Sequence, residues 1–420
     1  MTILVLGYGS SGRAAEKLAR KLGYEVVVCD DRMSGKDSAS PVSGGAPMAG
    51  VPAFAVVSPG VPLTSLLIAE CRRCGIPLKS ELQLGCEELK RQGWKLLAVT
   101  GSKGKSSVVK VVADAINLAG MHAVACGNYG LPVSEVAVSS PDLQSRPSTS
   151  RWAVVEVSSF MMETTELPAD TFEAAAILNL QEDHLDRHGS VETYHALKRK
   201  LLTMAKLGFE GESYGGRDVS ATLDLFAGSY FDNDILKANA WCAVALMRTA
   251  GLSDADIAAA FKEFVPLPHR MNIIAEIDGV EYIDDSKATS LSALAAGVIM
   301  ASTSISTSTS TSTFNLQPSI RLIAGGLPKG DDPKSVVSIL TERVKKVYLI
   351  GQSAEAFSSA WKSYVDCEIC GTMEAAVAAA KREAATGDKV LLSPGTASFD
   401  QFKSFGERGD VFARLVKKEK

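Results

Sequence analysis

A short glycine-containing stretch carries residue types suited to binding a nucleoside triphosphate. Gly101 and Gly104 follow an apolar run, and Lys105 and Ser106 open a segment whose valines and alanines recur at helical spacing. Strand, glycine loop and helix form a phosphate cradle, because glycines allow close backbone approach and the helix start presents N–H groups. The lysine suits the outer phosphates and the serine hydroxyl suits Mg²⁺. The plainer alternative, a glycine turn before an ordinary helix, is disfavoured by Gly-Lys-Ser directly after a buried strand.

Two later apolar runs, 152–155 and 174–180, end in further polar groups. Glu156 follows the first run directly, and His184 follows the second within a short acidic turn. Ligands bind at the carboxyl ends of strands in an open α/β sheet, so Glu156 is a predicted metal ligand, with a helix cap as the alternative. His184, taken alone, also suits a hydrogen-bonded turn. Lys198, taken alone, is expected to be an ordinary solvated lysine.

The chain opens with a second loop of similar design. An apolar run at 3–6 leads into Gly7, Gly9 and Gly12, and a second strand ends at Asp30. This Rossmann-type opening, read alone, suggests a nicotinamide dinucleotide. The same loop can hold the diphosphate of any nucleotide conjugate, so both interpretations stay open.

The elements that position these residues alternate between strand and helix along the whole chain. A length of 420 residues exceeds what one core supports, so more than one domain is expected. A proline-stiffened linker at 265–270 marks one boundary. The sequence predicts an α/β protein of three domains, 1–92, 93–266 and 267–420, with the nearly pure Ser/Thr run at 302–313 as a surface loop.

Bulk composition is that of a globular protein with small-molecule partners. Hydrophobic residues make up 46% and charged residues 22%, and the net charge of −4 argues against nucleic acid as the main partner. No apolar run is long enough to cross a bilayer, and no basic leader precedes the first strand. The scattered cysteines suit a reducing compartment. We expect a cytoplasmic protein without a membrane partner.

Taken together, the motifs resemble those of the Mur ligase family, in order and over essentially the whole chain. The stretches that carry the resemblance are 101–106, 156–160, 182–187, 267–270, 284–289 and 392–398. The last, continuing to Phe405, is similar to the D-glutamate-adding branch. The resemblance implies an ATP-dependent amide ligase that adds D-glutamate to UDP-N-acetylmuramoyl-L-alanine through an acyl phosphate, in peptidoglycan precursor synthesis. It also implies a Rossmann-like N-terminal domain, a central P-loop ATPase domain and a Rossmann-like C-terminal domain.

The resemblance implies a role for each matching residue. The ATP site would comprise Gly101, Ser102, Lys103, Gly104, Lys105, Ser106, Ser107, Asn239, Arg270 and Asp285. The UDP substrate would be bound by Ser10, Ser11, Asp31, Arg32, Ser58, Asn128 and Ser158. D-glutamate would be bound by Lys287, Thr289, Lys329, Ser398 and Phe405.

Catalysis would rest on four of the matching residues: Lys105, Glu156, His184 and Lys198. Ser106, Glu156, His184 and Lys198 would serve two Mg²⁺ sites, with Lys198 carbamylated, which reverses the expectation of a solvated lysine. A monomer is expected. The alternatives are another Mur-family ligase, adding a different amino acid or extending folate with glutamate, and an NAD-dependent dehydrogenase suggested by the N-terminal glycines.

Overall fold

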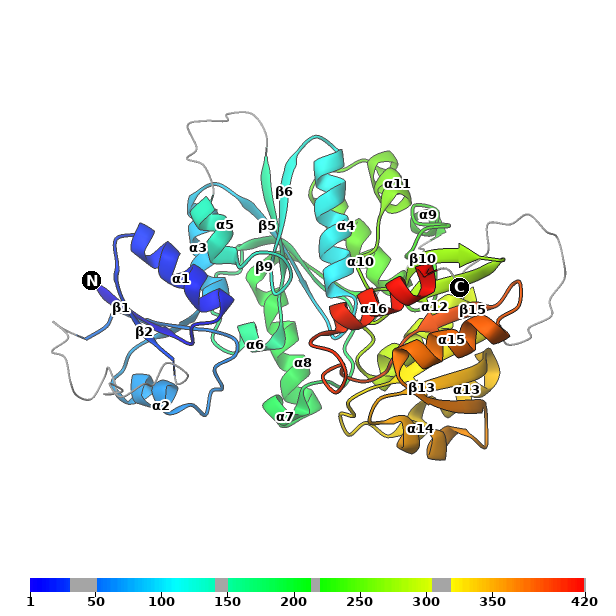
Figure 1. The fold of residues 1–420 in the computed structure, drawn as a ribbon. Coiled ribbons are helices and arrows are strands. Elements are labelled where there is room, and N and C mark those ends of the chain that lie inside the picture. Colours follow the sequence, from blue (N-terminus) through cyan, green and yellow to red (C-terminus); the bar gives the residue numbers. More distant parts are fainter. Residues whose placement is uncertain (31–50, 140–149, 213–219, 304–318, 419–420) are drawn as a thin grey trace. The chain divides into compact units, whose positions relative to one another are not determined.

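The chain folds into two compact units, Met1–Phe264 and Val265–Lys420. The computed structural model, shown in Figure 1, describes residues 1–30, 51–139, 150–212, 220–303 and 319–418. Asp31, Arg32 and most of the Ser/Thr run therefore lie outside the described residues. No helix among those described is long and apolar enough to cross a membrane.

The first unit begins with a four-stranded parallel sheet in the order β2-β1-β3-β4. Its elements are β1 (Thr2–Leu6), α1 (Ser10–Lys21), β2 (Glu25–Cys29), β3 (Ala55–Val57), α2 (Leu66–Arg73), β4 (Leu78–Ser80) and α3 (Glu81–Arg91). The strands are short and mostly buried, as expected for a parallel sheet with both faces covered.

The second sheet is also parallel, with five strands in the order β6-β7-β5-β8-β9. Its strands are β5 (Lys95–Thr100), β6 (His122–Gly127), β7 (Arg151–Glu156), β8 (Phe172–Ile177) and β9 (Ala205–Glu210). The helices are α4 (Lys105–Leu118), α5 (Val133–Ser139), α6 (Ser159–Met162), α7 (Leu185–His188), α8 (Val191–Lys200), the 3₁₀ turn η3 (Leu201–Met204), α9 (Ser220–Leu223), α10 (Lys237–Thr249) and α11 (Asp254–Glu263). The predicted strand at 96–99 and the helix beginning at Lys105 are confirmed. Figure 1 shows α4, which packs against α10 and α11, beside this sheet.

One hydrophobic core joins the first two sheets. It contains Ile3 and Val5 of β1, Leu96 of β5 and Val155 of β7, with α3 and α5 packed together between the sheets. This continuous core is why segments 1–92 and 93–264 form a single compact unit. Their division into separate domains stays a prediction.

The second unit is built on a six-stranded sheet in the order β10-β11-β15-β12-β13-β14, in which β10 pairs antiparallel with β11 and the other pairs are parallel. Its strands are β10 (Asn272–Ile277), β11 (Val280–Asp284), β12 (Ile320–Gly325), β13 (Val344–Ile350), β14 (Asp366–Gly371) and β15 (Lys389–Leu392). The helices are α12 (Leu291–Thr303), the 3₁₀ turn η5 (Pro333–Val336), α13 (Val337–Arg343), α14 (Ala354–Trp361), α15 (Met373–Glu383) and α16 (Phe405–Lys417).

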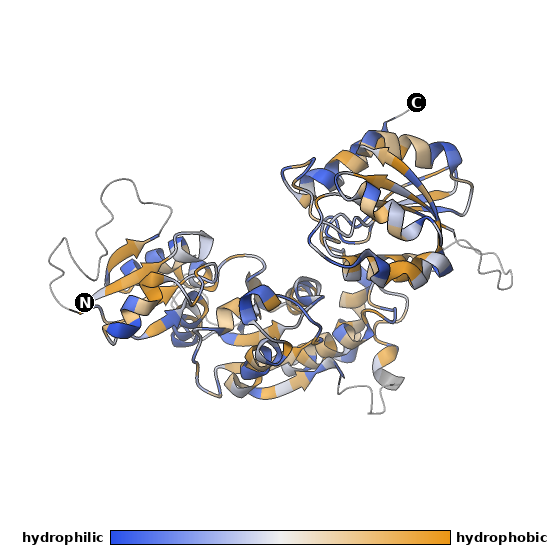
Figure 2. Cartoon of the chain, turned by 90° about the horizontal axis from the view of Figure 1, so that it is seen from below, coloured by the Kyte–Doolittle hydropathy of each residue, from blue (hydrophilic) through white to orange (hydrophobic). Residues whose placement is uncertain are grey.

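Both faces of this sheet are buried. Leu322 packs into one core cluster and its neighbour Ile323 into another, as alternating side chains of a strand must when helices cover both sides. The strands are correspondingly hydrophobic in Figure 2. The predicted α/β class is confirmed.

Candidate functional site

The loop between β5 and α4 leaves the start of α4 open. Gly101 has φ of 149° and Gly104 has φ of 84°, in the region where a side chain is strained. Gly104 is the N-cap of α4, and no side chain caps the helix there. The first N–H groups of α4 lie at the end of the helix where backbone donors and the helix dipole favour an anion.

Two lysines converge on this loop. Lys105 Nζ donates to the carbonyl oxygens of Gly101, at 2.8 Å, and Ser102, at 3.0 Å. Lys198 Nζ donates to the same Gly101 oxygen at 2.9 Å. Two lysine side chains therefore meet at one carbonyl oxygen, and their positive charge would complement a polyphosphate.

Lys198 is not the solvated lysine that its sequence context alone suggests. It is 1% exposed, because Tyr194, one turn earlier on α8, and the phosphate loop cover it. Burial, and then the charge of Lys105, lowers its pKa to about 7. A substantial fraction of Lys198 is therefore a neutral amine at neutral pH.

Glu156 ends β7 beside Val99 of β5, so it lies at the same sheet edge as the phosphate loop. Its Oε1 accepts a hydrogen bond from Asn128 Nδ2 at 2.7 Å, while its Oε2 is buried without a hydrogen-bond partner. A buried carboxylate oxygen without a partner is costly unless a ligand or ion satisfies it. Ser158 is occupied locally, since its hydroxyl caps α6 by accepting from Met161 N.

His184 reaches the phosphate loop through aromatic neighbours. Its backbone is left-handed, with φ of 54°, and its ring lies 4.9 Å from that of Phe160 and 6.3 Å from that of Tyr194. The Tyr194 hydroxyl is 3.1 Å from Ser102 Oγ, which also donates to Gln181 O. The turn after β8, helix α8 and the phosphate loop are thus held together.

Sequence reasoning missed Asn179. Its Oδ1 accepts from Lys103 N and its Nδ2 donates to Lys103 O, both at 2.9 Å. Nδ2 also lies 3.2 Å from Oδ1 of the buried Asn239. Asn179 therefore ties the phosphate loop to the start of α10. Its place at the end of the apolar run, at the carboxyl edge of the sheet, was the available signal.

The N-terminal glycine loop is organised by Ser58, whose hydroxyl donates to Gly7 O at 2.7 Å. Ser10 and Ser11 open α1, whose N-cap Gly9 provides no side-chain hydrogen bond. Asp30, at the end of β2, accepts from Tyr8 N at 2.6 Å. Three predicted substrate residues therefore gather at the carboxyl edge of the first sheet.

The second unit gathers most of the residues predicted to bind D-glutamate. Lys287 Nζ lies 3.9 Å from the Phe405 ring centroid. Backbone pairing between Leu327 and Ala397 brings the loop before Lys329 beside the loop of Ser398, and the hydrogen bond from Gly395 N to Ala288 O places Thr289 next to it.

Asp285 and Arg270, the predicted nucleotide contacts of this unit, lie in the loop after β11 and in the linker before β10. Asp285 is buried and accepts from Ser393 Oγ at 2.9 Å. Burial raises the pKa of Asp285 to about 7. The Arg270 backbone N–H donates to Asn272 Oδ1.

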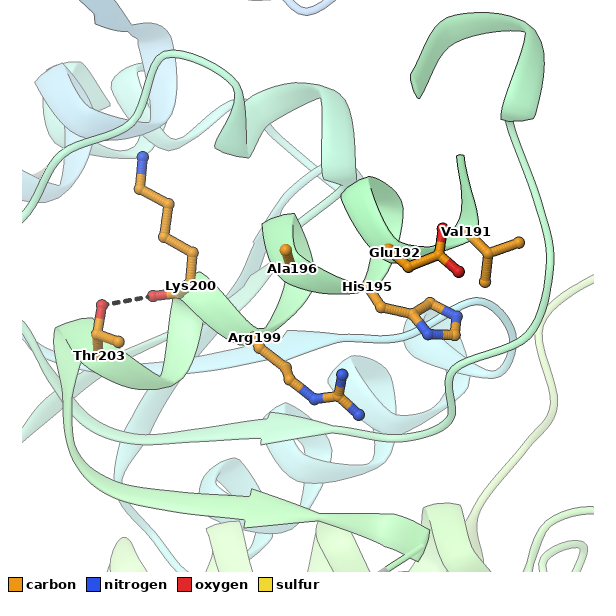
Figure 3. Close-up of a pocket in the computed structure, with 7 residues that line it drawn as sticks. All are labelled: Val191, Glu192, His195, Ala196, Arg199, Lys200 and Thr203. Atoms are coloured by element: carbon orange, nitrogen blue, oxygen red, sulfur yellow. Dashed lines mark hydrogen bonds between the residues drawn. The ribbon is translucent and has the colours of Figure 1, made fainter. Parts of the chain in front are cut away.

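A hollow of 480 Å³ lies on the other side of α8 from the phosphate loop. Figure 3 shows its lining, which consists of Val191, Glu192, His195, Ala196, Arg199, Lys200 and Thr203. None of these residues belongs to the predicted site. Tyr194 and Lys198 point to the opposite face of the helix, where they contact the loop.

Comparison with known proteins identifies the family. Family models described as the Mur ligase middle domain and the Mur ligase, glutamate ligase domain match residues 99–209 and 269–395. The chain is 32% identical to UDP-N-acetylmuramoylalanine--D-glutamate ligase of Acidobacterium capsulatum, over 99% of this chain and 95% of that protein. It is 33% identical to the protein of the same name in Dechloromonas aromatica, over 99% and 97%. The chain belongs to the Mur ligase family. The resemblance predicted from the motifs is confirmed.

Solved Mur ligases share this fold at low sequence identity. UDP-N-acetylmuramate-alanine ligase MurC of Thermotoga maritima aligns over 99% of this chain and 98% of its own, with a TM-score of 0.58 and 15% identity. MurF ligase of the same organism, solved in complex with ADP, aligns over 87% and 88%, with a TM-score of 0.55 and 13% identity.

Proposed function

We propose that this Mur ligase adds D-glutamate to UDP-N-acetylmuramoyl-L-alanine at the expense of ATP, in cytoplasmic peptidoglycan precursor synthesis. The observation that carries the proposal is the convergence of Lys105, Lys198 and Glu156, whose Oε2 is buried without a hydrogen-bond partner, at the phosphate loop. Full-length similarity to proteins named for this reaction supports the choice of substrates. The phosphate loop and the family match disfavour the dehydrogenase alternative.

The residues fit Mg²⁺ as a partner of bound ATP. Among the described residues, no three His, Cys, Asp or Glu side chains group closely enough to hold a metal by themselves. Mg²⁺ commonly uses one or two protein ligands together with substrate phosphates. Glu156 and Ser106 would supply such ligands on the phosphate-loop side, and His184 with Lys198 would serve a second site. Bound Mg²⁺ would offset the charge repulsion between a carboxylate and the γ-phosphate.

Lys198 would join the metal site as a carbamate. Its lowered pKa of about 7 supports this, because only the neutral amine attacks CO₂. The amine nitrogen would bond to the carbon of CO₂, the electron pair of one C–O π bond would move to oxygen, and one proton would leave to solvent, so the neutral amine becomes a carbamate anion. The change would replace the second positive charge at Gly101 O with a metal-binding oxygen pair.

The reaction would then proceed from charge neutralisation to amine attack. Lys105 would hold the γ-phosphate while an oxygen of the acceptor's L-alanine carboxylate bonds to the γ-phosphorus. The bond from that phosphorus to the bridging oxygen breaks, which gives an acyl phosphate and ADP. The D-glutamate amine, positioned by Lys287, Ser398 and Phe405, would attack the carbonyl carbon, and inorganic phosphate would leave. Exclusion of water protects the acyl phosphate from hydrolysis. We propose three domains, the outer two Rossmann-like, with hinge motion at 265–270, working as a monomer.

Phosphate release from purified protein tests the reaction. Release is expected only when ATP, Mg²⁺, UDP-N-acetylmuramoyl-L-alanine and D-glutamate are all present, and omission of any one should abolish it. The alternatives are tested in separate reactions. L-lysine or diaminopimelate replaces D-glutamate, and a folate substrate with L-glutamate replaces both substrates. Activity with one of those and none with D-glutamate would reject the proposed substrate while leaving the ligase class intact.

A further inference from the structure

Arg187 links two parts of the first unit whose relative position matters for the proposed reaction. They are the loop after β3 and the turn that carries His184. Arg187 lies on the short helix α7, three residues after His184. Its Nη2 donates to the carbonyl oxygen of Val61 at 2.9 Å and approaches that of Pro59 at 3.4 Å. These carbonyls belong to the loop after β3, which begins at Ser58. The contact therefore spans from the turn of the second sheet to a loop of the first.

The loop that Arg187 contacts is packed directly onto the N-terminal glycine loop. Ser58 Oγ donates to Gly7 O, and a Cβ added at Gly7 would lie 2.6 Å from Val61 Cγ2 and 3.1 Å from Ser58 Cβ. Gly7 therefore has no room between these neighbours. A displacement of residues 58–61 would displace the glycine loop as well.

The same guanidinium is also held by Glu163, the C-cap of α6. Its Nε and Nη2 donate to both carboxylate oxygens of Glu163, at 3.0 and 2.6 Å. The Arg187 side chain is 17% exposed and that of Glu163 is 6% exposed, so solvent screens this bidentate pair only weakly. The guanidinium carbon lies 5.0 Å from the Phe160 ring centroid, and the His184 ring contacts the same ring at 4.9 Å.

These contacts form one chain of packed groups. It runs from the glycine loop through residues 58–61, Arg187 and Phe160 to His184. An arginine suits the central position, because its planar fork can bond a carboxylate and backbone carbonyls at once, whereas a lysine provides a single point charge.

We propose that Arg187 is a positioning residue that holds the acceptor-binding loop 58–61 against the turn carrying His184. The inference rests on the proposed function, since it takes residues 58–61 as part of the site for the UDP-linked acceptor. Arg187 touches neither ATP nor the reacting carboxylate in this proposal. Its effect is on where the acceptor lies relative to the phosphate loop.

The test is the variant Arg187→Met, which keeps an unbranched apolar stem over Phe160 and removes the hydrogen bonds. The KM for UDP-N-acetylmuramoyl-L-alanine should rise about ten- to hundredfold, since charge-assisted bonds are lost, while the KM for ATP should change less than about threefold. Acceptor affinity measured by calorimetry without ATP should fall in parallel. Glu163→Gln, which keeps an acceptor oxygen but removes the charge, should give a smaller shift of the same kind.

Arg199→Ala is the matched control, because Arg199 lies on the outer face of α8, 53% exposed, and its ion pair with Glu210 is 4.0 Å long. It should leave both KM values unchanged. An unchanged acceptor KM in Arg187→Met, or equal rises in both KM values, would overturn the inference. If Arg187→Met does not fold, the same comparison of the acceptor KM with the ATP KM is made in Glu163→Gln.

The two proposals fail in distinguishable ways. A wild-type protein that binds the acceptor but releases no phosphate would refute the proposed reaction. The acceptor affinity of the variants would still test the positioning role of Arg187. A wild-type protein that binds no UDP-linked acceptor would overturn both.

Discussion

The two glycine loops of the first unit share a backbone design and differ in what surrounds them. Each follows a buried parallel strand and opens a helix whose N-cap is a glycine without a side-chain cap. Around the phosphate loop, the structure adds Lys105, Lys198 and Oε2 of Glu156, which has no hydrogen-bond partner. Around the N-terminal glycine loop, Ser58 Oγ donates to Gly7 O, Asp30 accepts from Tyr8 N and Arg13 donates to Tyr8 O. The comparison teaches that a helix start provides anion binding, whereas side chains from other strands and helices decide whether chemistry follows.

At a third helix start, that of α5, a side chain of the protein itself accepts a hydrogen bond from a backbone N–H group. At α5, the backbone N–H of Ser134 donates to Oε1 of the buried Glu81 at 2.6 Å. A side chain therefore occupies the position that an anion would take at the other two helices.

Removal of Lys105, whose ammonium group contacts the phosphate loop, should distinguish the two loops by the largest effect. Lys105→Ala should lower phosphate release by about 10²- to 10³-fold, because one preorganised donor to the transferring phosphoryl group is lost. Calorimetric affinity for the UDP-linked acceptor should stay within the error of the wild type. Lys110→Ala, further along α4, is the control. Comparable loss of acceptor binding in Lys105→Ala would show that the two loops are not independent.

The variant Lys198→Ala tests whether a carbamate on Lys198 acts beside the phosphate loop. Lys198→Ala should lose about a hundredfold in activity, as expected when a group that binds or orients a metal is removed. Formate, acetate or propionate should restore part of the activity by supplying the missing carboxylate. Mass spectrometry of the native wild-type protein in bicarbonate provides a reading that is independent of activity. Full activity of the variant without added carboxylate would reject the carbamate.

Matched glycine substitutions should separate the two loops. A Cβ at residue 12 would lie 2.0 Å from Gly7 O, and a Cβ at residue 104 would lie 2.1 Å from Asn239 Nδ2. Gly12→Ala should weaken acceptor binding by about tenfold or more and spare ATP, and Gly104→Ala should do the reverse, since overpacking displaces each loop.

Gly9→Ala is the control for overpacking within the protein, because a Cβ there meets no protein atom within 4 Å. It should retain wild-type stability and ATP affinity. If Gly12→Ala and Gly104→Ala weakened both ligands equally, the damage would be global and the comparison of the loops would lose its basis.

The smallest expected effect concerns α5, where Glu81 accepts a hydrogen bond from the backbone N–H of Ser134. Burial raises the pKa of Glu81 to about 7 from an ordinary 4.5, so the folded state holds a proton that the unfolded state releases. The stabilisation from that proton is complete below about pH 4.5 and is lost as the pH rises through about 7. Glu81→Gln should therefore gain stability relative to wild type between pH 5 and 8, on the order of 2 kcal/mol. Denaturant unfolding at both pH values checks this, and a difference independent of pH would refute it.

Local signals predicted the parts of the fold that depend on short stretches. The apolar run before Gly101 and the helical spacing after Lys105 located β5 and α4, because neighbouring residues decide strand and helix. The family and α/β class followed from several such motifs in order. The roles of the individual site residues stay predictions, with Asp31 and Arg32 outside the described residues.

The burial of Lys198 had no local signal. Its partner Gly101 is 97 residues away in the sequence, so only the packing of α8 against the phosphate loop could reveal it. The contacts of Asn179 with Lys103, 76 residues away, and of Arg187 with Val61, 126 residues away, likewise depend on tertiary packing.

By itself, the sequence determined which segments become strands, glycine loops and helices, and which residue types end each strand. Those properties depend on hydrophobic spacing and on backbone freedom at glycine, which act over a few residues. Only the tertiary structure decided which of those strand ends meet, which lysine loses its water, and which arginine joins the two sheets. Desolvation and hydrogen bonding depend on neighbours in space, and a parallel sheet places strand ends together irrespective of their separation in the chain.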